Sequence, residues 1–495
     1  MAVGGARRAA ARIGVGVLVA TTVAAGFAPP AQAADDDLVV MTRNLYLGAD
    51  VSSALGLLPD LPAAAQDMWS QVAATDFTAR VPVLAAETVA ARPAVIGIQE
   101  ATTWECRPSA FAGTTVVYDF TQQFLDATAA AGTPYVLASA NGRTAINQGY
   151  SIPAIPRLTR VVDPETFQPL FGTDEADCGF TIADALAVRG DLAGQVLDVG
   201  TVEYENAAAI VPVLMEVQRG YAWADIRIGS TPVRFVTTHL EAFWKAGAVP
   251  ASAEQARQLV RDLAEVSMPL VVMGDFNSDP RDPRTPGDNP GGQPEATGDC
   301  PAQSGTDGTC SAYWTMIGAG YTDSGPDATD PLNLSWGASG LLAGPDLERL
   351  AAAKALGNTY GITDRLDYVF TRNGVTVRQA ALVGNDWPTE GGTWACTTPA
   401  QIENAEAAAK AMGVTLPASG ACLPTDHAGV VATLAAPASD VDDPPLPERV
   451  GFPFTRWAVG IGALVLLVLA VRGLVRRRRR RKAAKRAARD AASTG

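Results

Sequence analysis

Short apolar runs that end abruptly in polar residues recur along the chain. The clearest covers residues 269–273, a partly β-branched run typical of a strand buried on both faces, and Gly274, Asp275 and Asn277 follow it. Asp275 and Asn277 stand two apart, so on an extended strand end they point to the same side. Burying a carboxylate and a carboxamide there costs desolvation energy unless something uses them. The pattern fits either a functional strand end or an ordinary turn formed by Asp and Asn.

Other apolar runs carry polar residues at the same kind of position. The runs cover residues 38–43, 93–99, 233–238, 366–370 and 428–434, and the polar residues beside them are Asn44, Glu100, His239, Asp367, Asp426 and His427. The chain has only two histidines, and both stand at such positions. Because chance would rarely place both there, we expect these strand ends to form one polar site.

The remaining pattern predicts alternating helices and strands. Helical periodicity occurs at residues 77–91, 114–131, 251–265, 345–356 and 401–412, and strand-like runs at 135–138, 182–189, 211–217, 221–228 and 376–383. Residues 141–177 are expected to form a long excursion over the polar site, and residues 280–310 and 385–423 to be insertions. Strands that alternate with helices, together with antiparallel pairs, predict an α/β fold with two packed mixed β-sheets and helices outside.

The N-terminal residues 1–33 have the pattern of a secretory signal peptide. Arg7, Arg8 and Arg12 precede an apolar stretch at residues 13–27, and Ala31-Gln32-Ala33 offers a cleavage site between small residues. The alternative is an N-terminal membrane anchor, but the apolar stretch is short and Pro29-Pro30 interrupt it. We therefore expect the chain to be exported.

A second apolar segment, residues 457–475, precedes a run of arginines and lysines. Its length suits a single transmembrane helix, and the basic block after it predicts a cytoplasmic tail. A basic tail can also bind nucleic acid, but its place directly after an apolar segment favours the membrane. The expected organisation is a signal peptide (1–33), a catalytic domain with loop insertions (34–435), a stalk rich in Pro and Asp (436–456), a transmembrane helix (457–475) and a tail (476–495), which places the domain outside the cell membrane.

Charge is distributed very unevenly along the chain. The whole chain has a net charge of −14. Without the signal peptide and the basic C-terminal region it keeps 23 basic and 51 acidic residues, a net charge near −28. So acidic a surface repels polyanions unless divalent cations intervene. It disfavours tight nucleic-acid binding without excluding a metal-dependent nuclease.

Six cysteines in an exported chain predict disulfides. Sequence proximity favours the pairs Cys300–Cys310, Cys396–Cys422 and Cys106–Cys178, among fifteen possible connectivities. No spacing of Cys and His suggests structural zinc.

The polar strand ends resemble the motifs of the endonuclease/exonuclease/phosphatase superfamily, which includes deoxyribonuclease I-like nucleases, neutral sphingomyelinases and inositol-polyphosphate 5-phosphatases. The matching segments, in the family's order, are Arg43-Asn44-Leu45, Ile98-Gln99-Glu100, Thr238-His239-Leu240, Gly274-Asp275-Phe276-Asn277, Arg365-Leu366-Asp367-Tyr368 and Thr425-Asp426-His427. Each is weak alone, but six in order are specific. The resemblance implies a four-layer α/β sandwich.

The resemblance also implies roles for individual residues. Glu100 would be the principal Mg²⁺ ligand, with Asn44 beside it and Asp426 as a further ligand; Mn²⁺ can substitute for Mg²⁺. Asp275 would orient or deprotonate the attacking water, and Asn277 would hold a phosphate oxygen. His239 would donate to the phosphoryl oxygens, while His427, oriented by Asp367, would carry positive charge or relay a proton.

The reaction implied is metal-assisted hydrolysis of a phosphate ester by in-line attack of water, carried out by a monomer. Nuclease, sphingomyelinase-type lipase and inositol-phosphate phosphatase remain open as substrate classes. An alternative of another class is a catalytically silent adhesion or binding module on the same fold.

Several of these residues also have structural interpretations. Glu100 could lie in a salt bridge, both histidines could be hydrogen-bonded core residues, and Asp367 could pair with Arg365. Asp184 stands where some members of the superfamily place a partner for the first histidine. The segment Asn141-Gly142-Arg143 favours a turn over a substrate contact.

Overall fold

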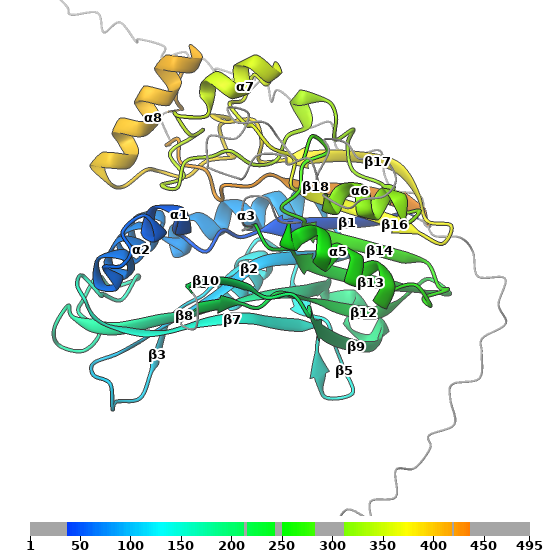
Figure 1. The fold of residues 1–495 in the computed structure, drawn as a ribbon, viewed down its shortest axis with the longest axis horizontal. Coiled ribbons are helices and arrows are strands. Elements are labelled where there is room, and N and C mark those ends of the chain that lie inside the picture. Colours follow the sequence, from blue (N-terminus) through cyan, green and yellow to red (C-terminus); the bar gives the residue numbers. More distant parts are fainter. Residues whose placement is uncertain (1–36, 212–214, 243–249, 283–310, 418–419, 436–495) are drawn as a thin grey trace, which may run out of the picture. The chain divides into compact units, whose positions relative to one another are not determined.

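The apolar runs predicted as strands assemble into two packed sheets in the computed structural model (Figure 1), which describes residues 37–211, 215–242, 250–282, 311–417 and 420–435. The first sheet has eight strands in the order β17-β18-β1-β2-β8-β4, with β3 paired to β2 and β7 to β8. Its strands are β1 (Asp37–Asn44), β2 (Val95–Arg107), β3 (Thr115–Asp119), β4 (Tyr135–Leu137), β7 (Ile146–Leu158), β8 (Ala176–Arg189), β17 (Thr376–Val383) and β18 (Gly429–Ala435).

The second sheet has six strands in the order β15-β16-β14-β13-β12-β9. These are β9 (Val196–Glu203), β12 (Gly220–Ile228), β13 (Thr231–His239), β14 (Leu270–Asp275), β15 (Thr322–Asp323) and β16 (Asp367–Arg372). Two short hairpins accompany the sheets, formed by β5 (Ser139–Ala140) with β6 (Arg143–Thr144) and by β10 (Ala208–Val211) with β11 (Met215–Val217).

The inner faces of the two sheets form one apolar core. Val40 and Val95 of the first sheet pack in one cluster with Phe235 and Val271 of the second. Gly97 lies where the sheets approach closely, because a Cβ added there would stand 2.9 Å from Oγ1 of Thr237.

Helices cover both outer faces. The first sheet packs against α2 (Leu61–Thr75), α3 (Phe77–Ala91) and α4 (Phe120–Ala130), with α1 (Val51–Leu55) beside α2. The second sheet packs against α5 (Ala251–Asp262) and α6 (Ala312–Gly318). Helices α7 (Leu350–Leu356) and α8 (Pro399–Met412) lie together beyond the β17–β18 edge (Figure 1). The predicted α/β fold with two packed mixed sheets is therefore confirmed.

Four predicted elements differ from the structure. The strand predicted at residues 211–217 is two strands, since β10 ends at Val211 and β11 begins at Met215. Residues 114–131 divide into β3 and α4, because the β-branched and aromatic start of this segment suits a strand and Asp119 caps the helix by accepting from the Gln122 amide. Residues 141–177 hold the long strand β7, which pairs antiparallel with β8, the strand that follows it in the chain. The helix predicted from residue 345 begins only at Leu350.

Two of the predicted disulfides are present. Cys106 joins Cys178 across the paired strands β2 and β8, and Cys396 joins Cys422. The third predicted pair, Cys300–Cys310, lies outside the described residues.

Within the part of the chain that the structure describes, no helix has the length and apolar character needed to cross a membrane. The predicted signal peptide, stalk, transmembrane segment and tail all lie outside that part, and so do residues 283–310 of the predicted insertion.

Candidate active site

The strand order brings the predicted polar residues to one place. Strand β1 is parallel to β2 in the first sheet, and β13 is parallel to β14 in the second. Carboxyl ends of parallel neighbours lie at the same edge, so Asn44, His239 and Asp275 meet there, and the β2 residue Glu100 joins them. Strand β16 runs antiparallel to β14, so its first residue, Asp367, lies opposite Asp275, the last residue of β14.

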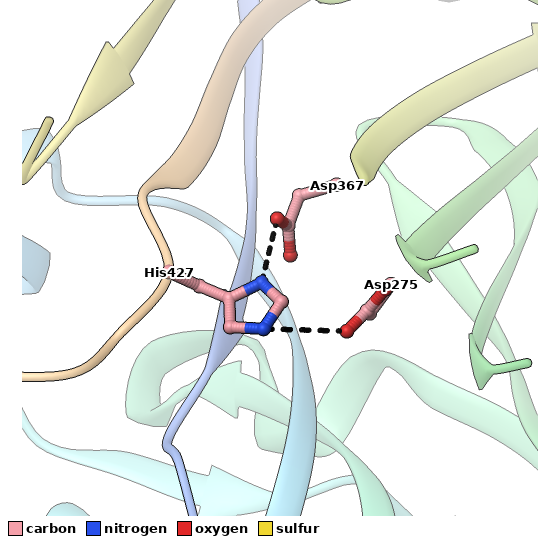
Figure 2. A group of neighbouring side chains, drawn as sticks. All are labelled: Asp275, Asp367 and His427. Carbon is pink, nitrogen blue, oxygen red and sulfur yellow. Dashed lines mark hydrogen bonds and ion pairs between the residues drawn. The ribbon is translucent and has the colours of Figure 1, made fainter. Parts of the chain in front are cut away.

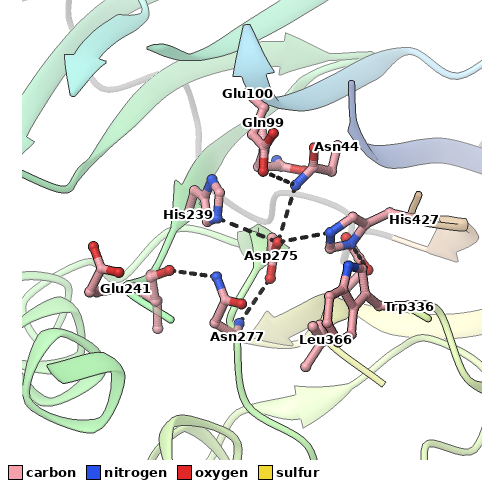
Figure 3. A network of polar contacts seen from close by, with 12 residues as sticks. Asn44, Gln99, Glu100, His239, Glu241, Asp275, Asn277, Trp336, Leu366 and His427 are labelled. Carbon is pink, nitrogen blue, oxygen red and sulfur yellow. Dashed lines mark hydrogen bonds and ion pairs between the residues drawn. The ribbon is translucent and has the colours of Figure 1, made fainter. Parts of the chain in front are cut away.

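Asp275 is the centre of the resulting network (Figure 3). Its carboxylate accepts from Nδ2 of Asn44 at 3.1 Å and from the backbone N–H of Asn277 at 2.9 Å. Nε2 of His239 lies 3.5 Å away and Nε2 of His427 lies 3.6 Å away. Burial raises the pKa of Asp275 to about 7, and the charges of Asp367 and Glu100 add to this while His427 opposes it. This carboxylate can therefore exchange a proton near neutral pH.

His427 is held as a cation by the carboxylates around it. Its Nδ1 lies 2.9 Å from Oδ2 of Asp367 (Figure 2), and the same oxygen accepts from the Ser335 hydroxyl at 2.6 Å. Burial opposes the charge, but Asp367, Asp426 and Asp275 outweigh it and raise the pKa of His427 well above its usual value. The side chain is 5% exposed, so this positive charge acts within a largely desolvated site.

His239 has the opposite protonation state. Nη1 of Arg219 lies 3.1 Å from its Nδ1. Burial, Arg219 and His427 lower the pKa of His239 well below its usual value, so the ring is neutral. A guanidinium can only donate, so Nδ1 is the acceptor and Nε2 carries the proton, facing Asp275.

Glu100 reaches the site through a β-bulge. Strand β2 continues past Glu100 to Arg107, but its register with β8 shifts between Ile98 and Ala101. Glu100 itself has a φ of 53°, a conformation that non-glycine residues adopt rarely and mostly at functional positions. The strand predicted to end at Glu100 is thus longer than expected, and the bulge turns this side chain to the site.

The oxygens of Glu100 are held by local donors. They accept from Nδ2 of Asn44 at 3.1 Å and from the backbone N–H of Leu47 at 2.5 Å. None of the ion pairs within the described ranges includes Glu100. The alternative prediction, that Glu100 lies in a salt bridge, is therefore wrong.

Asp426 lies in the loop before β18. Its Oδ2 accepts from Nε1 of Trp336 at 3.1 Å, and its Oδ1 lies 3.9 Å from Nε2 of His427. Burial raises the pKa of Asp426 to about 6, and the charge of Glu100 adds to the shift while His427 opposes it.

Buried arginines fix this loop beside the end of β1. Arg80 of α3 donates to the carbonyls of Leu45, Tyr46 and Pro424. Arg43 donates to the carbonyl of His427 at 2.5 Å. These guanidinium–carbonyl hydrogen bonds join residues more than 300 positions apart in the sequence. They bring the last predicted motif, which contains Asp426 and His427, next to the first, which contains Asn44.

Asn277 does not continue the extended strand β14, although the sequence pattern predicts that it does, because this strand ends at Asp275. It has a φ of 45°, its backbone N–H donates to Asp275, and its Nδ2 donates to the carbonyl of Leu240 at 2.8 Å. In this arrangement its amide fixes the backbone after His239.

The donor set fits a divalent cation. Glu100 raises the pKa of Asp184, Asp275 and Asp426 through its charge, in addition to the larger effect of burial. Oxygen donors and concentrated negative charge are what Mg²⁺ requires, and Glu100 and Asp426 supply carboxylate oxygens. The amide oxygen of Asn44 accepts from the backbone N–H of Tyr46 at 2.8 Å, which leaves its second lone pair for a cation.

Asp275, Asp367 and His427 form another group whose ligand atoms lie within 4.8 Å of one another. A protonated imidazole offers no lone pair, and Nδ1 of His427 already bonds to Asp367. This group is therefore better described as a chain of ion pairs than as a metal centre.

Sequence reasoning missed some of the site. Arg219 precedes β12 with no local pattern that marks it, and besides His239 its guanidinium contacts Glu241 at 3.3 Å and lies over the Tyr150 ring. Glu241 stands two residues after His239, a spacing that could have been noticed. Ser335 and Trp336 lie in an irregular segment before α7, where periodicity gives no signal.

The remaining alternatives are decided by contacts. Arg365 donates to the backbone carbonyl of Asp367 and not to its carboxylate, so the predicted local ion pair is wrong. Oδ1 of Asp184 lies 3.9 Å from Nδ1 of His239, and Arg219 makes the closer contact to that nitrogen. Residues 141–142 form the predicted turn, between β5 and β6.

The model of the endonuclease/exonuclease/phosphatase family matches residues 69–388. The chain belongs to this family. Members of the endonuclease/exonuclease/phosphatase family are generally phosphoester hydrolases. The matched residues include Glu100, His239, Asp275, Asn277 and Asp367, whereas Asn44, Asp426 and His427 lie beyond them and join the site through the contacts described above.

Solved structures of the family resemble the chain at low identity. A family protein from Bacteroides thetaiotaomicron is 15% identical, with 81% of this chain and 98% of that chain covered and a TM-score of 0.39. A family protein from Beutenbergia cavernae is 16% identical, with 82% and 73% covered and a TM-score of 0.40. A mannosyl-6-phosphatase from B. thetaiotaomicron is 14% identical, with 80% and 99% covered and a TM-score of 0.37. A search of curated proteins gives no match.

Proposed function

We propose that this chain is an exported, membrane-anchored, Mg²⁺-dependent phosphoesterase that hydrolyses phosphate esters by in-line attack of water. The observation that carries the proposal is the setting of Asp275, a buried carboxylate with a pKa near 7 between a neutral imidazole and a cationic one. A base, a neutral donor and a cation at one point are the groups that phosphoryl transfer to water requires.

The residues divide the work by their protonation states. Asp275 accepts a proton from the attacking water. His239 presents Nε2–H as a neutral donor to a phosphoryl oxygen. His427, oriented by Asp367, offers positive charge to the phosphoryl group or a proton to the leaving oxygen. Asn277 positions the backbone that carries His239 and Asp275, and its carbonyl oxygen and second N–H remain for contacts with the substrate.

Glu100, Asn44 and Asp426 would hold the cation. When bound, a divalent cation neutralises phosphoryl charge and stabilises the leaving oxygen. Mn²⁺ has the same preference for oxygen ligands and is expected to substitute.

The proposed export and anchoring rest on the sequence patterns of residues 1–33 and 457–475. Fractionation of cells that express the full chain, with protease added from outside, tests both. The proposal requires that the catalytic domain is digested in intact cells and that the chain sediments with membranes.

The experiment that tests the catalytic proposal uses the purified protein with Mg²⁺ and a panel of phosphate esters. The panel contains DNA, RNA, sphingomyelin, inositol phosphates and the soluble diester bis(p-nitrophenyl) phosphate. Hydrolysis of any of them that Asp275→Asn abolishes supports the proposal. A folded protein that hydrolyses none would instead be a binding module on this fold.

A further inference from the structure

The indole of Trp336 lies at one side of the candidate active site. It stands beside His427 (Figure 3), with the two ring centroids 6.3 Å apart, and its Nε1–H donates to Oδ2 of Asp426 at 3.1 Å. Asp426 is one of the carboxylates proposed to hold the cation. A residue that no sequence pattern marks is therefore hydrogen-bonded to a proposed metal ligand.

The backbone of Trp336 is held by two segments of the site. Its N–H donates to the carbonyl of Asp364 at 2.9 Å, and its carbonyl accepts from the N–H groups of Thr363 and Asp364, each at 3.0 Å. It also forms an antiparallel β-bridge with His427. A Cβ added to the next residue, Gly337, would stand 2.9 Å from the backbone nitrogen of Thr363, so the segment is closely packed. The indole therefore projects from a fixed backbone.

The guanidinium of Arg349 covers one face of the indole. Its Cζ lies 4.2 Å from the ring centroid. Asp346 and Asp364 hold the guanidinium there, with carboxylate oxygens 3.5 Å from Nε and 3.4 Å from Nη1. Arg349 is 5% exposed, so this cation–π contact is largely desolvated. Polar contacts in series polarise one another, so the cation strengthens the indole N–H as a donor to Asp426.

The two oxygens of Asp426 are consequently unequal. Oδ2 accepts from the Trp336 indole. Oδ1 lies 3.9 Å from Nε2 of His427 and 3.4 Å from the hydroxyl of Thr425, and that hydroxyl has a closer acceptor in the carbonyl of Asn44, at 3.0 Å. A hydroxyl group carries a single proton, so Oδ1 is the more open oxygen of the carboxylate.

We propose that Trp336 sets the cation preference of the site by restricting Asp426 to one ligand oxygen. The inference rests on the proposed phosphoesterase function, whose cation site includes Asp426. Mg²⁺ is small and demands a near-ideal octahedron, whereas Ca²⁺ forms longer bonds and accepts both oxygens of one carboxylate. Asp426 offers Oδ1 as a single ligand atom, which suits Mg²⁺. Bidentate binding of Ca²⁺ would have to share or break the hydrogen bond from the indole.

Glu100 offers less room for this choice. Its Oε1 accepts from Nδ2 of Asn44 and its Oε2 accepts from the backbone N–H of Leu47. Both of its oxygens therefore have donors already, and a bidentate contact would disturb both hydrogen bonds. At Asp426 a single hydrogen bond, from Trp336, stands between one and two ligand oxygens.

The first test compares the parent protein with Trp336→Phe, which keeps an aromatic ring against Arg349 and removes the N–H. Mn²⁺ binding is followed by the electron paramagnetic resonance signal of the free ion, and Mg²⁺ and Ca²⁺ are titrated as competitors without substrate. Trp336→Phe should lower the Mg²⁺ affinity by about tenfold or more, the usual contribution of a hydrogen-bond partner of a metal ligand. The Ca²⁺ affinity should stay the same or rise, so the preference for Mg²⁺ should decrease.

Trp314→Phe is the matched control. Trp314 is also partly exposed, and its indole N–H donates to a backbone carbonyl, that of Pro280, at 2.8 Å. This variant should keep the parent's affinity for both cations. A folded Trp336→Phe that keeps the parent's ratio of Mg²⁺ to Ca²⁺ affinity would overturn the inference. This includes an equal fall in both affinities, because a general loss of structure acts on both cations alike.

Failure of the inference and failure of the proposed function give different results. A folded parent protein that binds no divalent cation and hydrolyses no phosphate ester with Mg²⁺ would refute both. A parent protein that binds Mg²⁺ and hydrolyses bis(p-nitrophenyl) phosphate, with a Trp336→Phe variant of unchanged cation preference, would refute the inference alone. Where the inference holds, Ca²⁺ should inhibit the Mg²⁺-dependent reaction of the variant at a lower concentration than that of the parent.

The parent protein itself provides the test if Trp336→Phe does not fold. With isotope-labelled tryptophan, one indole N–H signal in the nuclear magnetic resonance spectrum should shift as Mg²⁺ is added, because its acceptor belongs to a carboxylate that binds the ion. Mn²⁺ identifies this signal, since the paramagnetic ion broadens the nearest N–H most strongly. If Mg²⁺ displaces bound Mn²⁺ but shifts no indole signal, the inference is overturned.

Discussion

Nη1 of Arg219 lies 3.1 Å from Nδ1 of His239, and this contact sets which nitrogen of the ring carries the proton. The guanidinium is itself buried and lies 3.3 Å from the buried carboxylate of Glu241. The ion pair with Glu241 thus keeps the Arg219 guanidinium in place beside a histidine that must stay neutral. In this site an arginine takes the orienting position, and Asp184, which stands where some members of the superfamily place a partner for this histidine, lies farther away, at 3.9 Å.

Replacing Arg219 should therefore affect catalysis through His239. In Arg219→Met with Glu241→Gln, which removes both charges together, we expect turnover to fall by about 10²-fold or more while KM changes little, because a neutral donor in the wrong tautomer cannot assist the transition state. The titration of His239, followed by NMR, should shift toward its usual pKa. A purely structural role would lower the melting temperature and leave turnover per folded molecule unchanged.

His427 and Asp367 should behave as one unit. His427→Ala removes the cation that acts on the phosphoryl group, so turnover should fall by about 10²- to 10⁴-fold with a modest change in apparent affinity. Asp367→Asn should fall less, because the imidazole remains but loses its orienting charge. The double variant should be scarcely worse than His427→Ala alone. Additive losses would show that the two residues act independently, and near-normal turnover of the folded histidine variants would leave a binding module.

Metal removal should abolish activity. The ligand set of Glu100, Asn44 and Asp426 predicts that a chelator stops hydrolysis and that Mg²⁺ or Mn²⁺ restores it. Glu100→Gln should weaken metal binding, measured by calorimetry, while the melting temperature of the metal-free protein stays close to that of the parent. Full activity in chelator would refute the metal-dependent mechanism.

Gly274 should tolerate no side chain. Its φ is 153°, and a Cβ added there would stand 2.0 Å from the carbonyl oxygen of Thr238 on the neighbouring strand. Gly274→Ala must therefore push β13 and β14 apart directly beside His239 and Asp275. We expect a loss of several kcal/mol in the free energy of unfolding, since large losses follow from strain in a packed core. Chemical denaturation measures it, with Gly113→Ala, where an added Cβ meets nothing within 4 Å, as the control.

The third disulfide can be tested chemically. Cys106–Cys178 and Cys396–Cys422 are formed in the structure, and the pair that remains is Cys300 with Cys310. Peptide mapping without reduction should recover these two residues in one cross-linked peptide. Free thiols at both positions in the folded protein would show that the chain folds without this bond.

The sequence by itself determined the strands and the chemistry at their ends. Apolar runs stop at Asn44, His239 and Asp275. The parallel pairs β1–β2 and β13–β14 bring such strand ends to one edge, and this does not depend on the conformation of the loops. Hydrophobic alternation and an abrupt change of polarity are local properties, so they can be read without knowing the neighbours. The same holds for α3, whose bounds match the predicted residues 77–91.

Tertiary structure alone decided the rest. The bulge that turns Glu100 into the site exists because β2 shifts its register against β8, a partner more than 80 residues away. Arg219 gains its role only when β12 and β13 lie side by side, and Trp336 reaches Asp426 only because its segment lies against the loop before β18. Pairing register, ion pairs and hydrogen bonds between distant residues depend on which segments meet, and local composition does not encode that choice.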